Sequence, residues 1–185
     1  MNRVSMISLM LGAAITATPV AARPTAPVAH YSIPTTPIHY RTVKVDGLDI
    51  FYREAGDPAK PTILLLHGFP ASSHQFRDLI PLLADKYHVV APDYPGFGHS
   101  SQPAPADYGY TFDHLYETVD HFTRAVGVDR FAVYIQDYGA PLGLRFALLQ
   151  PQRVTALIVQ NGNAYEVGLA PIWAPIRALW AKDTP

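Results

Sequence analysis

Three short segments of this sequence gather residue types that can do chemistry. They are residues 67–70 (HGFP), residues 93–100 (DYPGFGHS) and residues 136–141 (QDYGAP). Each follows a short apolar run and contains glycine, proline or both, which is typical of a loop that leaves a strand. The carboxyl ends of the strands form the site in an open α/β sheet. We therefore expect the three segments to meet at one edge of such a sheet.

Asp137 has two interpretations from the residues alone. An aspartate directly before a helix can serve as the N-cap of that helix. It can also act as a nucleophile, because a carboxylate that attacks a saturated carbon forms a stable alkyl ester. Attack on a carbonyl would instead give an anhydride. A nucleophilic Asp137 therefore indicates substrates with an electrophilic sp3 carbon.

The composition excludes several other chemistries. The 185 residues include 14 Lys+Arg and 15 Asp+Glu, and a net charge of -1 offers no basic field for nucleic acid. The absence of cysteine removes disulfides, thiolate zinc sites, iron–sulfur clusters and cysteine nucleophiles. The histidines show no H-E-x-x-H spacing, and no glycine-rich segment has the lysine of a phosphate loop. We therefore expect no metal site and no cofactor.

The elements that must position these segments follow from the spacing of apolar residues. Residues 63–66 are apolar on both faces, as in a strand covered by helices on each side. Apolar residues at three- and four-residue steps predict a helix over 111–126 with Thr111 as its N-cap. A second helix is predicted over 140–150, where Pro151 stops it. The predicted strands are residues 39–45, 50–54, 62–67, 88–92, 130–136 and 154–160. This alternation predicts an α/β protein with a mostly parallel sheet and helices on both faces.

In this order and at these strand ends, the three segments resemble the α/β-hydrolase fold, in particular its epoxide hydrolase and haloalkane dehalogenase branch. The resemblance covers residues 39–161. Residues 135–139 resemble the nucleophile elbow, whose general pattern is G-x-S-x-G on a sharp turn from strand to helix. Asp137 takes the central place and Gly139 matches, whereas Ile135 replaces the first glycine. The resemblance favours the nucleophile over the N-cap.

The resemblance implies a role for each matching residue. Asp137 would attack the substrate, and water would then hydrolyse the resulting ester with help from a histidine base. The backbone N–H groups of Phe69 and Tyr138 would form the oxyanion hole. His67 is expected to brace the oxyanion loop through hydrogen bonds, and His99 to lie on the loop surface. The supporting loop residues are His67, Gly68, Pro70 and Gly139.

The implied substrate is a small hydrophobic electrophile, either an epoxide or an alkyl halide. In the dehalogenases that the chain resembles, two N–H donors placed beside the nucleophile hold the departing halide. This chain has Tyr138 and Phe69 at those positions, and a phenylalanine side chain cannot donate. The HGFP spelling is that of epoxide hydrolases, so epoxide hydrolysis ranks first and dehalogenation second. A non-catalytic binding or interaction protein of the periplasm is the competing class.

The N-terminus predicts export. Arg3 is followed by a mostly apolar run over residues 4–17, and Ala21 and Ala22 are small enough for a cleavage site. The apolar run is too short to span a bilayer stably. Residues 1–22 are therefore predicted to be a secretory signal peptide cleaved after Ala22, which makes the protein secreted or periplasmic. Four prolines predict an extended linker over residues 23–38.

The resemblance also divides the remaining chain. Residues 39–161 are expected to form the N-terminal part of the hydrolase core. Residues 162–185 are expected to open a lid domain, with an amphipathic helix that carries Trp173 and Trp180. Hydrolases of this fold place the acid and the histidine after later strands. The sequence as written ends at Pro185 before such residues, so we expect a truncated core that cannot complete turnover by itself.

Overall fold

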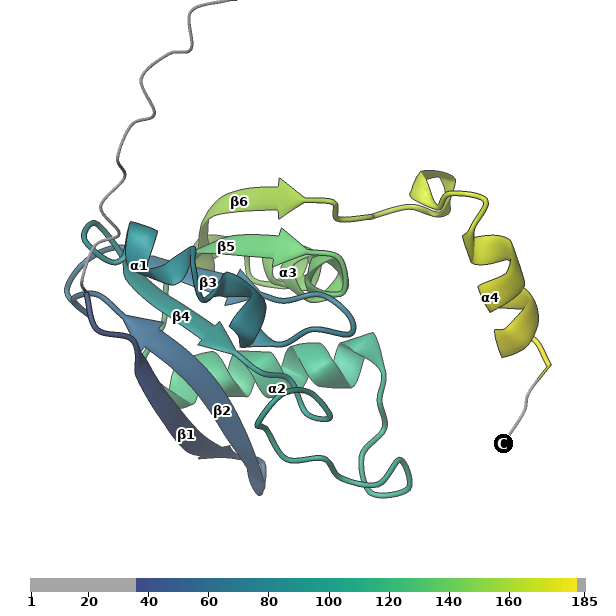
Figure 1. The fold of residues 1–185 in the computed structure, drawn as a ribbon, viewed down its shortest axis with the longest axis horizontal. Helices are drawn as coiled ribbons and strands as arrows, with labels where there is room; N and C mark the ends of the chain where they lie inside the picture. Colours follow the sequence, from purple (N-terminus) through teal and green to yellow (C-terminus); the bar gives the residue numbers. More distant parts are fainter. Residues whose placement is uncertain (1–35, 183–185) are drawn as a thin grey trace, which may run out of the picture. The chain divides into compact units, whose positions relative to one another are not determined.

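The computed structural model describes residues 36–182, without the side chains of Glu166 and Trp180. The predicted signal peptide and residues 23–35 of the predicted linker lie outside the described residues. Figure 1 shows a single sheet with helices packed against it, followed by the segment that carries α4. The strands are β1 (His39–Val45), β2 (Leu48–Ala55), β3 (Thr62–Leu66), β4 (His88–Pro92), β5 (Phe131–Gln136) and β6 (Val154–Gln160). The helices are η1 (Ser73–Phe76), α1 (Ile80–Leu83), α2 (Phe112–Ala125), α3 (Gly139–Leu149), η2 (Pro151–Arg153), η3 (Glu166–Gly168) and α4 (Trp173–Trp180).

The sheet has the strand order β1-β2-β4-β3-β5-β6. The pairs β4–β3, β3–β5 and β5–β6 are parallel, and β2 is antiparallel to both of its neighbours. Five of the six strands therefore run in one direction, which confirms the mostly parallel sheet predicted from the sequence. As a result, β3, β4 and β5 end at the same edge, and each is followed there by one of the three segments singled out above.

The sequence predicts a first hairpin that turns at Asp46-Gly47, and the structure has this turn, but the second strand begins earlier than predicted. Asp46 and Gly47 have φ angles of 49° and 83°, as a two-residue type I′ turn requires. Because the turn uses only these two residues, β2 begins at Leu48 and pairs directly with Val45. The sequence prediction, which began this strand at Ile50, was two residues too short at that end.

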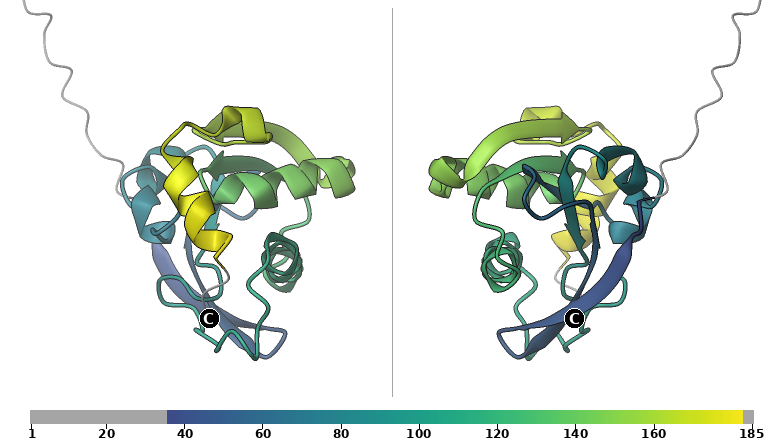
Figure 2. Two further views of the ribbon diagram at one scale, coloured as in Figure 1. Left: turned by 90° about the vertical axis from the view of Figure 1, so that its right-hand side faces the viewer. Right: turned by 90° about the vertical axis from the view of Figure 1, so that its left-hand side faces the viewer.

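The two faces of the sheet bury separate hydrophobic cores. On β3, Leu64 and Leu66 belong to the core that includes residues of α2 and α3. The alternate residues, Ile63 and Leu65, belong to the core that includes Phe76 of η1 and residues of α1. Figure 2 shows α2 and α3 on one side of the sheet and α1 on the other. Helices on both faces explain why β3 is apolar at every buried position.

The two longest helices begin and end close to where the sequence predicts. Thr111 is the N-cap of α2, and its hydroxyl accepts a hydrogen bond from the His114 N–H at 3.1 Å. α3 begins at Gly139 and ends at Leu149, before Pro151. Its second glycine, Gly143, lies so close to β5 that a Cβ there would be 2.1 Å from the Ile135 side chain. α3 is therefore held against the strand that leads into the predicted site.

Arg153 lies where η2 leads into β6, and this charged residue is only 5% exposed. A guanidinium has five N–H donors, and the structure provides an acceptor for each of them. The partners are the Asp120 carboxylate, the Gln150 amide oxygen at 3.1 Å, the Thr123 hydroxyl at 2.9 Å, and the carbonyls of Val128 at 2.8 Å and Asp129 at 2.7 Å. The side chain thus ties α2 and the turn after it to the start of β6.

Between residues 36 and 182, no helix is both long enough and apolar enough to cross a bilayer.

Candidate active site

Asp137 stands on a sharp turn between β5 and α3. Its φ angle is 49°, a left-handed conformation that non-glycine residues seldom adopt and that is enriched at turns and at functional sites. The turn also requires glycine nearby. A Cβ on Gly139 would lie 2.4 Å from the Leu66 carbonyl oxygen, and one on Gly68 would lie 2.2 Å from Gln136 Oε1. The backbone therefore has the crowded geometry that the elbow pattern predicts.

One oxygen of the Asp137 carboxylate is held by two backbone N–H groups. Oδ1 accepts hydrogen bonds from the Phe69 N–H at 2.9 Å and from the Tyr138 N–H at 2.7 Å. Phe69 comes from the loop after β3 and Tyr138 from the loop after β5, so two separate loops converge on one atom. Oδ2 is the oxygen that neither of these donors holds. The structure thus brings together Asp137 and the two residues predicted to form the oxyanion hole.

The same geometry decides against the N-cap alternative. The N-cap of α3 is Tyr138, and no side chain caps this helix by a hydrogen bond. A capping side chain accepts from the N–H of the second or third helical residue. Asp137 instead accepts from the residue next to it and from a distant loop.

His67 connects the end of β3 to the loop after β4. Its ring is fully buried and stacks on Tyr94 with 3.9 Å between the ring centroids. Nδ1 donates to the Gly68 carbonyl at 2.9 Å, Nε2 accepts from the Tyr94 N–H at 3.4 Å, and the Tyr94 hydroxyl donates to the His67 carbonyl at 2.9 Å. These contacts fit a neutral imidazole, and they place His67 as a support of the loop that carries the Phe69 N–H.

Burial lowers the pKa of the His67 imidazole, and its hydrogen bond to Gly68 and the nearby Asp93 offset this only in part. The unfolded chain, with a His pKa of about 6.5, therefore binds more protons than the folded chain in a window below that pH. Lowering the pH through this window should reduce the free energy of unfolding by up to about 1.4 kcal/mol per pH unit. We expect His67→Gln to reduce this slope in urea unfolding measured between about pH 7.5 and pH 5.5.

The exposed His99 provides the control for this measurement, because His99→Gln makes the same change on a surface position. An unchanged slope in His67→Gln would show that the buried imidazole does not set the acid sensitivity. The comparison uses the slope and not the absolute stability, since His67→Gln also removes packing against Tyr94.

Asp93 organises the loop after β4. It is fully buried, and its Oδ1 and Oδ2 accept the backbone N–H groups of Ser73 at 2.7 Å and His99 at 2.9 Å. A Cβ on Gly98 would lie 1.9 Å from Asp93 Oδ2, so the loop closes tightly around the carboxylate. Asp93 thus holds the second segment in shape, and His99 lies on its exposed side as predicted.

Two glutamines that the sequence analysis did not select support the first and third segments. The Gly68 N–H donates to Gln75 Oε1 at 3.3 Å, and Gln75 Nε2 donates to Gln136 Oε1 at 3.3 Å. Gln136 lies in the third segment, and its position directly before Asp137 was the only feature of the sequence that could have indicated this supporting role. Gln75 lies on η1, a short element without a periodic pattern.

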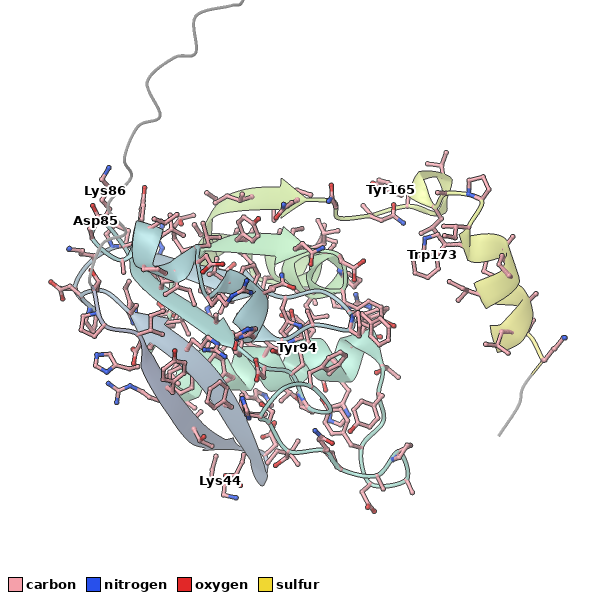
Figure 3. All side chains as sticks on the ribbon, viewed as in Figure 1. Lys44, Asp85, Lys86, Tyr94, Tyr165 and Trp173 are labelled. Carbon is pink, nitrogen blue, oxygen red and sulfur yellow. The ribbon has the colours of Figure 1, made fainter. Side chains whose placement is uncertain are left out.

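A pocket of about 460 Å³ opens beside Asp137. This is within the range of small-molecule sites. Residues of α2, of the turn between β5 and α3, and of α3 line one part of it, and residues 161–173 line the other; Figure 3 shows Trp173 at the start of α4. Its lining residues include Phe112, Asp137, Tyr138, Pro141, Asn161, Leu169 and Trp173. We call it the Asp137 pocket. Within residues 36–182, no cluster of three or more His, Cys, Asp or Glu side chains is arranged to hold a metal ion.

A mostly parallel sheet that presents a carboxylate on a strand-to-helix turn, with two backbone donors on one of its oxygens, is the architecture of an α/β hydrolase. A family model described as "alpha/beta hydrolase fold" matches residues 61–183. The chain belongs to the alpha/beta hydrolase fold family. The fold class and the family resemblance drawn from the sequence are thereby confirmed.

Known relatives include enzymes of both activities considered above. An uncharacterized hydrolase of Saccharomyces cerevisiae is 50% identical over 136 residues, 73% of this chain and 46% of the relative. Epoxide hydrolase A of Mycobacterium tuberculosis is 36% identical over 144 residues, 77% of this chain and 44% of that protein. The crystal structure of a haloalkane dehalogenase from Bradyrhizobium elkani matches with a TM-score of 0.65 and 32% identity, over 68% of this chain and 42% of that one. The chain thus spans less than half the length of these proteins.

Proposed function

We propose that the protein hydrolyses epoxides through a covalent ester on Asp137. The observation that carries the proposal is the pair of N–H groups that hold Asp137 Oδ1 at 2.9 and 2.7 Å. Oxyanion-hole donors lie about 2.7–3.1 Å from the oxygen they stabilise. The relative named epoxide hydrolase A supports the choice of reaction.

In the first step, Asp137 Oδ2 attacks one carbon of the epoxide. A new C–O bond forms, the bond from that carbon to the epoxide oxygen breaks, and that oxygen takes up a proton from solvent water to become a hydroxyl. The product of this step is a hydroxyalkyl ester of Asp137. The N–H groups of Phe69 and Tyr138 orient the carboxylate, because they hold Oδ1 and leave Oδ2 to react.

In the second step, water attacks Cγ of the ester and gives a proton to a general base, which the family resemblance places after later strands of the fold. Negative charge then develops on Oδ1, which already lies between the two N–H donors. The tetrahedral intermediate collapses, the bond from Cγ to the ester oxygen breaks, that oxygen takes up the proton from the base, and the diol leaves. Because the donors are in place before the reaction, they stabilise this charge without reorganisation.

Halide displacement by the same carboxylate is the second candidate. Trp173, whose indole carries an N–H group, lines the Asp137 pocket, and a structurally similar protein is a haloalkane dehalogenase. The Phe69 side chain has no hydrogen-bond donor, so it cannot stabilise a departing halide. Epoxide opening therefore remains the first candidate.

Mass spectrometry of the protein tests this function. We expect styrene oxide, followed by an acid quench, to add the mass of one epoxide to the peptide that contains Asp137. A parallel incubation with 1-bromobutane measures bromide release. An adduct on other carboxylates only, such as the exposed Asp78, would contradict the proposal, and bromide release without an epoxide adduct would favour the second candidate.

A further inference from the structure

A second, apolar pocket lies next to the Asp137 pocket. Its volume is about 230 Å³, and it shares Phe112 and Tyr138 with the Asp137 pocket. We call it the aromatic pocket, and its lining residues are Phe69, Phe97, Tyr110, Phe112, Leu115 and Tyr138. These residues come from the three loops at the carboxyl edge of the sheet and from the start of α2, so the pocket is part of the same edge as the site.

The walls of the aromatic pocket present ring edges and faces. Phe69 and Phe97 meet at 87° with 6.2 Å between ring centroids, and Phe112 and Tyr138 meet at 65° with 4.9 Å. Aromatic rings favour such edge-to-face contacts at centroid distances of about 4.5–7 Å. The Tyr110 hydroxyl donates to the Pro103 carbonyl at 2.7 Å, so its polar end already has a partner. The pocket therefore suits an additional aromatic ring.

The exposure of Phe69 indicates that the pocket is open to a ligand. Its side chain is 61% exposed, although it packs near Tyr138 with 5.3 Å between the ring centroids. Contiguous exposed apolar surface marks ligand-binding grooves and interaction sites, and Phe69 adjoins the rings of Phe97 and Tyr138. An apolar cavity of about 150 Å³ is enough to bind benzene in a protein. The aromatic pocket has room for one ring and a short substituent.

Two residues connect the aromatic pocket to the reactive carboxylate. The backbone N–H groups of Phe69 and Tyr138 hold Asp137 Oδ1, and the side chains of the same residues line the aromatic pocket. A ring bound there lies beside the carboxylate that attacks. We propose that the substrates of this protein carry an aromatic ring, which occupies the aromatic pocket while the epoxide faces Asp137. That the substrate carries an epoxide rests on the proposed function. That it carries an aromatic ring rests on the geometry of the aromatic pocket alone.

Leu115 offers a way to fill the pocket without touching the carboxylate or its donors. It is buried on α2 and lines the aromatic pocket but not the Asp137 pocket. We expect Leu115→Phe to lower the second-order rate constant for ester formation with styrene oxide by about 10- to 100-fold, a size typical of discrimination in an apolar pocket. The same rate constant for propylene oxide, which has a methyl group in place of the ring, should stay within about twofold.

Two further variants keep the test independent of folding. Phe97→Leu removes a ring without overfilling the pocket, and we expect it also to reduce activity on styrene oxide selectively. Leu148→Phe makes the same change as Leu115→Phe on an exposed side chain of α3 that lines neither pocket, and it should leave both substrates unaffected. Equal losses on both epoxides in Leu115→Phe and Phe97→Leu would overturn the inference.

Binding of the product diols separates this inference from the proposed function. By ligand-observed NMR, we expect styrene glycol to bind the wild-type protein more tightly than propylene glycol, and Leu115→Phe to abolish that preference. If the preference is seen but neither epoxide reacts, the aromatic pocket stands and the proposed reaction is wrong. If the two diols bind equally, the aromatic pocket does not select a ring, even if both epoxides are hydrolysed.

Discussion

Replacing Asp137 with asparagine is expected to slow formation of the covalent ester with styrene oxide by about 10⁴-fold or more, a loss of the size seen when other hydrolases lose their catalytic nucleophile. An amide has nearly the shape of a carboxylate, and its oxygen still accepts the N–H groups of Phe69 and Tyr138, which hold Oδ1 in the wild-type protein. Its nitrogen, however, takes the place of the attacking oxygen and carries no negative charge. The rate at which the protein gains the mass of styrene oxide, followed by mass spectrometry, measures the loss.

Stability and a matched variant complete this comparison. The free energy of unfolding of Asp137→Asn should lie within about 1 kcal/mol of the wild-type value, because both hydrogen bonds are retained. Asp78→Asn makes the same chemical change on an exposed side chain and should leave the rate unchanged. Ester formation that survives in Asp137→Asn would mean that another group attacks the substrate, and the proposed mechanism would be wrong.

Replacing Arg153 with methionine is expected to lower the free energy of unfolding by about 3–5 kcal/mol. The change leaves Asp120 Oδ1 without its buried cationic partner, while Oδ2 keeps only the half-exposed Arg124 at 3.2 Å, and it also removes the donors to Thr123 and to the Val128 carbonyl. A buried charge that loses its partner costs far more than an exposed one, because water cannot solvate it in place of the partner. Urea unfolding of the two proteins gives the difference.

Surface ion pairs provide the control for this second prediction. Arg77 and Asp78 form a pair at 3.2 Å in which both side chains are more than half exposed. Arg77→Met should change the free energy of unfolding by less than about 1 kcal/mol. The double variant Arg153→Met/Asp120→Leu removes both buried charges and should recover part of the loss. If it recovers nothing, the loss in Arg153→Met comes from packing and not from the buried Asp120 Oδ1 that loses its donor.

Much of the fold follows from local sequence patterns. The apolar run on β3, the hydroxyl of Thr111 and the turn at Asp46-Gly47 each act over a few residues, and the structure has the elements they predict. α1 was not predicted, because four residues are too few to show helical periodicity.

The long-range contacts were harder to predict. Arg153 bonds Asp120, 33 positions away in the sequence, and a charged residue gives no local signal that it is buried. The meeting of Phe69 with Asp137 spans 68 positions. That meeting was anticipated because the family resemblance pairs the two loops, and not because any spacing required it. The support that Gln75 gives to Gly68 had no such guide, so the sequence analysis missed it.

The two N–H groups on Asp137 Oδ1 also determine which oxygen atoms leave the protein with the product. The Asp137 oxygen that attacks leaves with the diol, and an oxygen from water replaces it in the carboxylate. In ¹⁸O-labelled water, the first diol released by each molecule should therefore carry an unlabelled oxygen taken from the protein itself, and later diols should carry the label. Because both donors retain Oδ1 throughout, Asp137 should gain one heavy oxygen and not two, however many cycles follow.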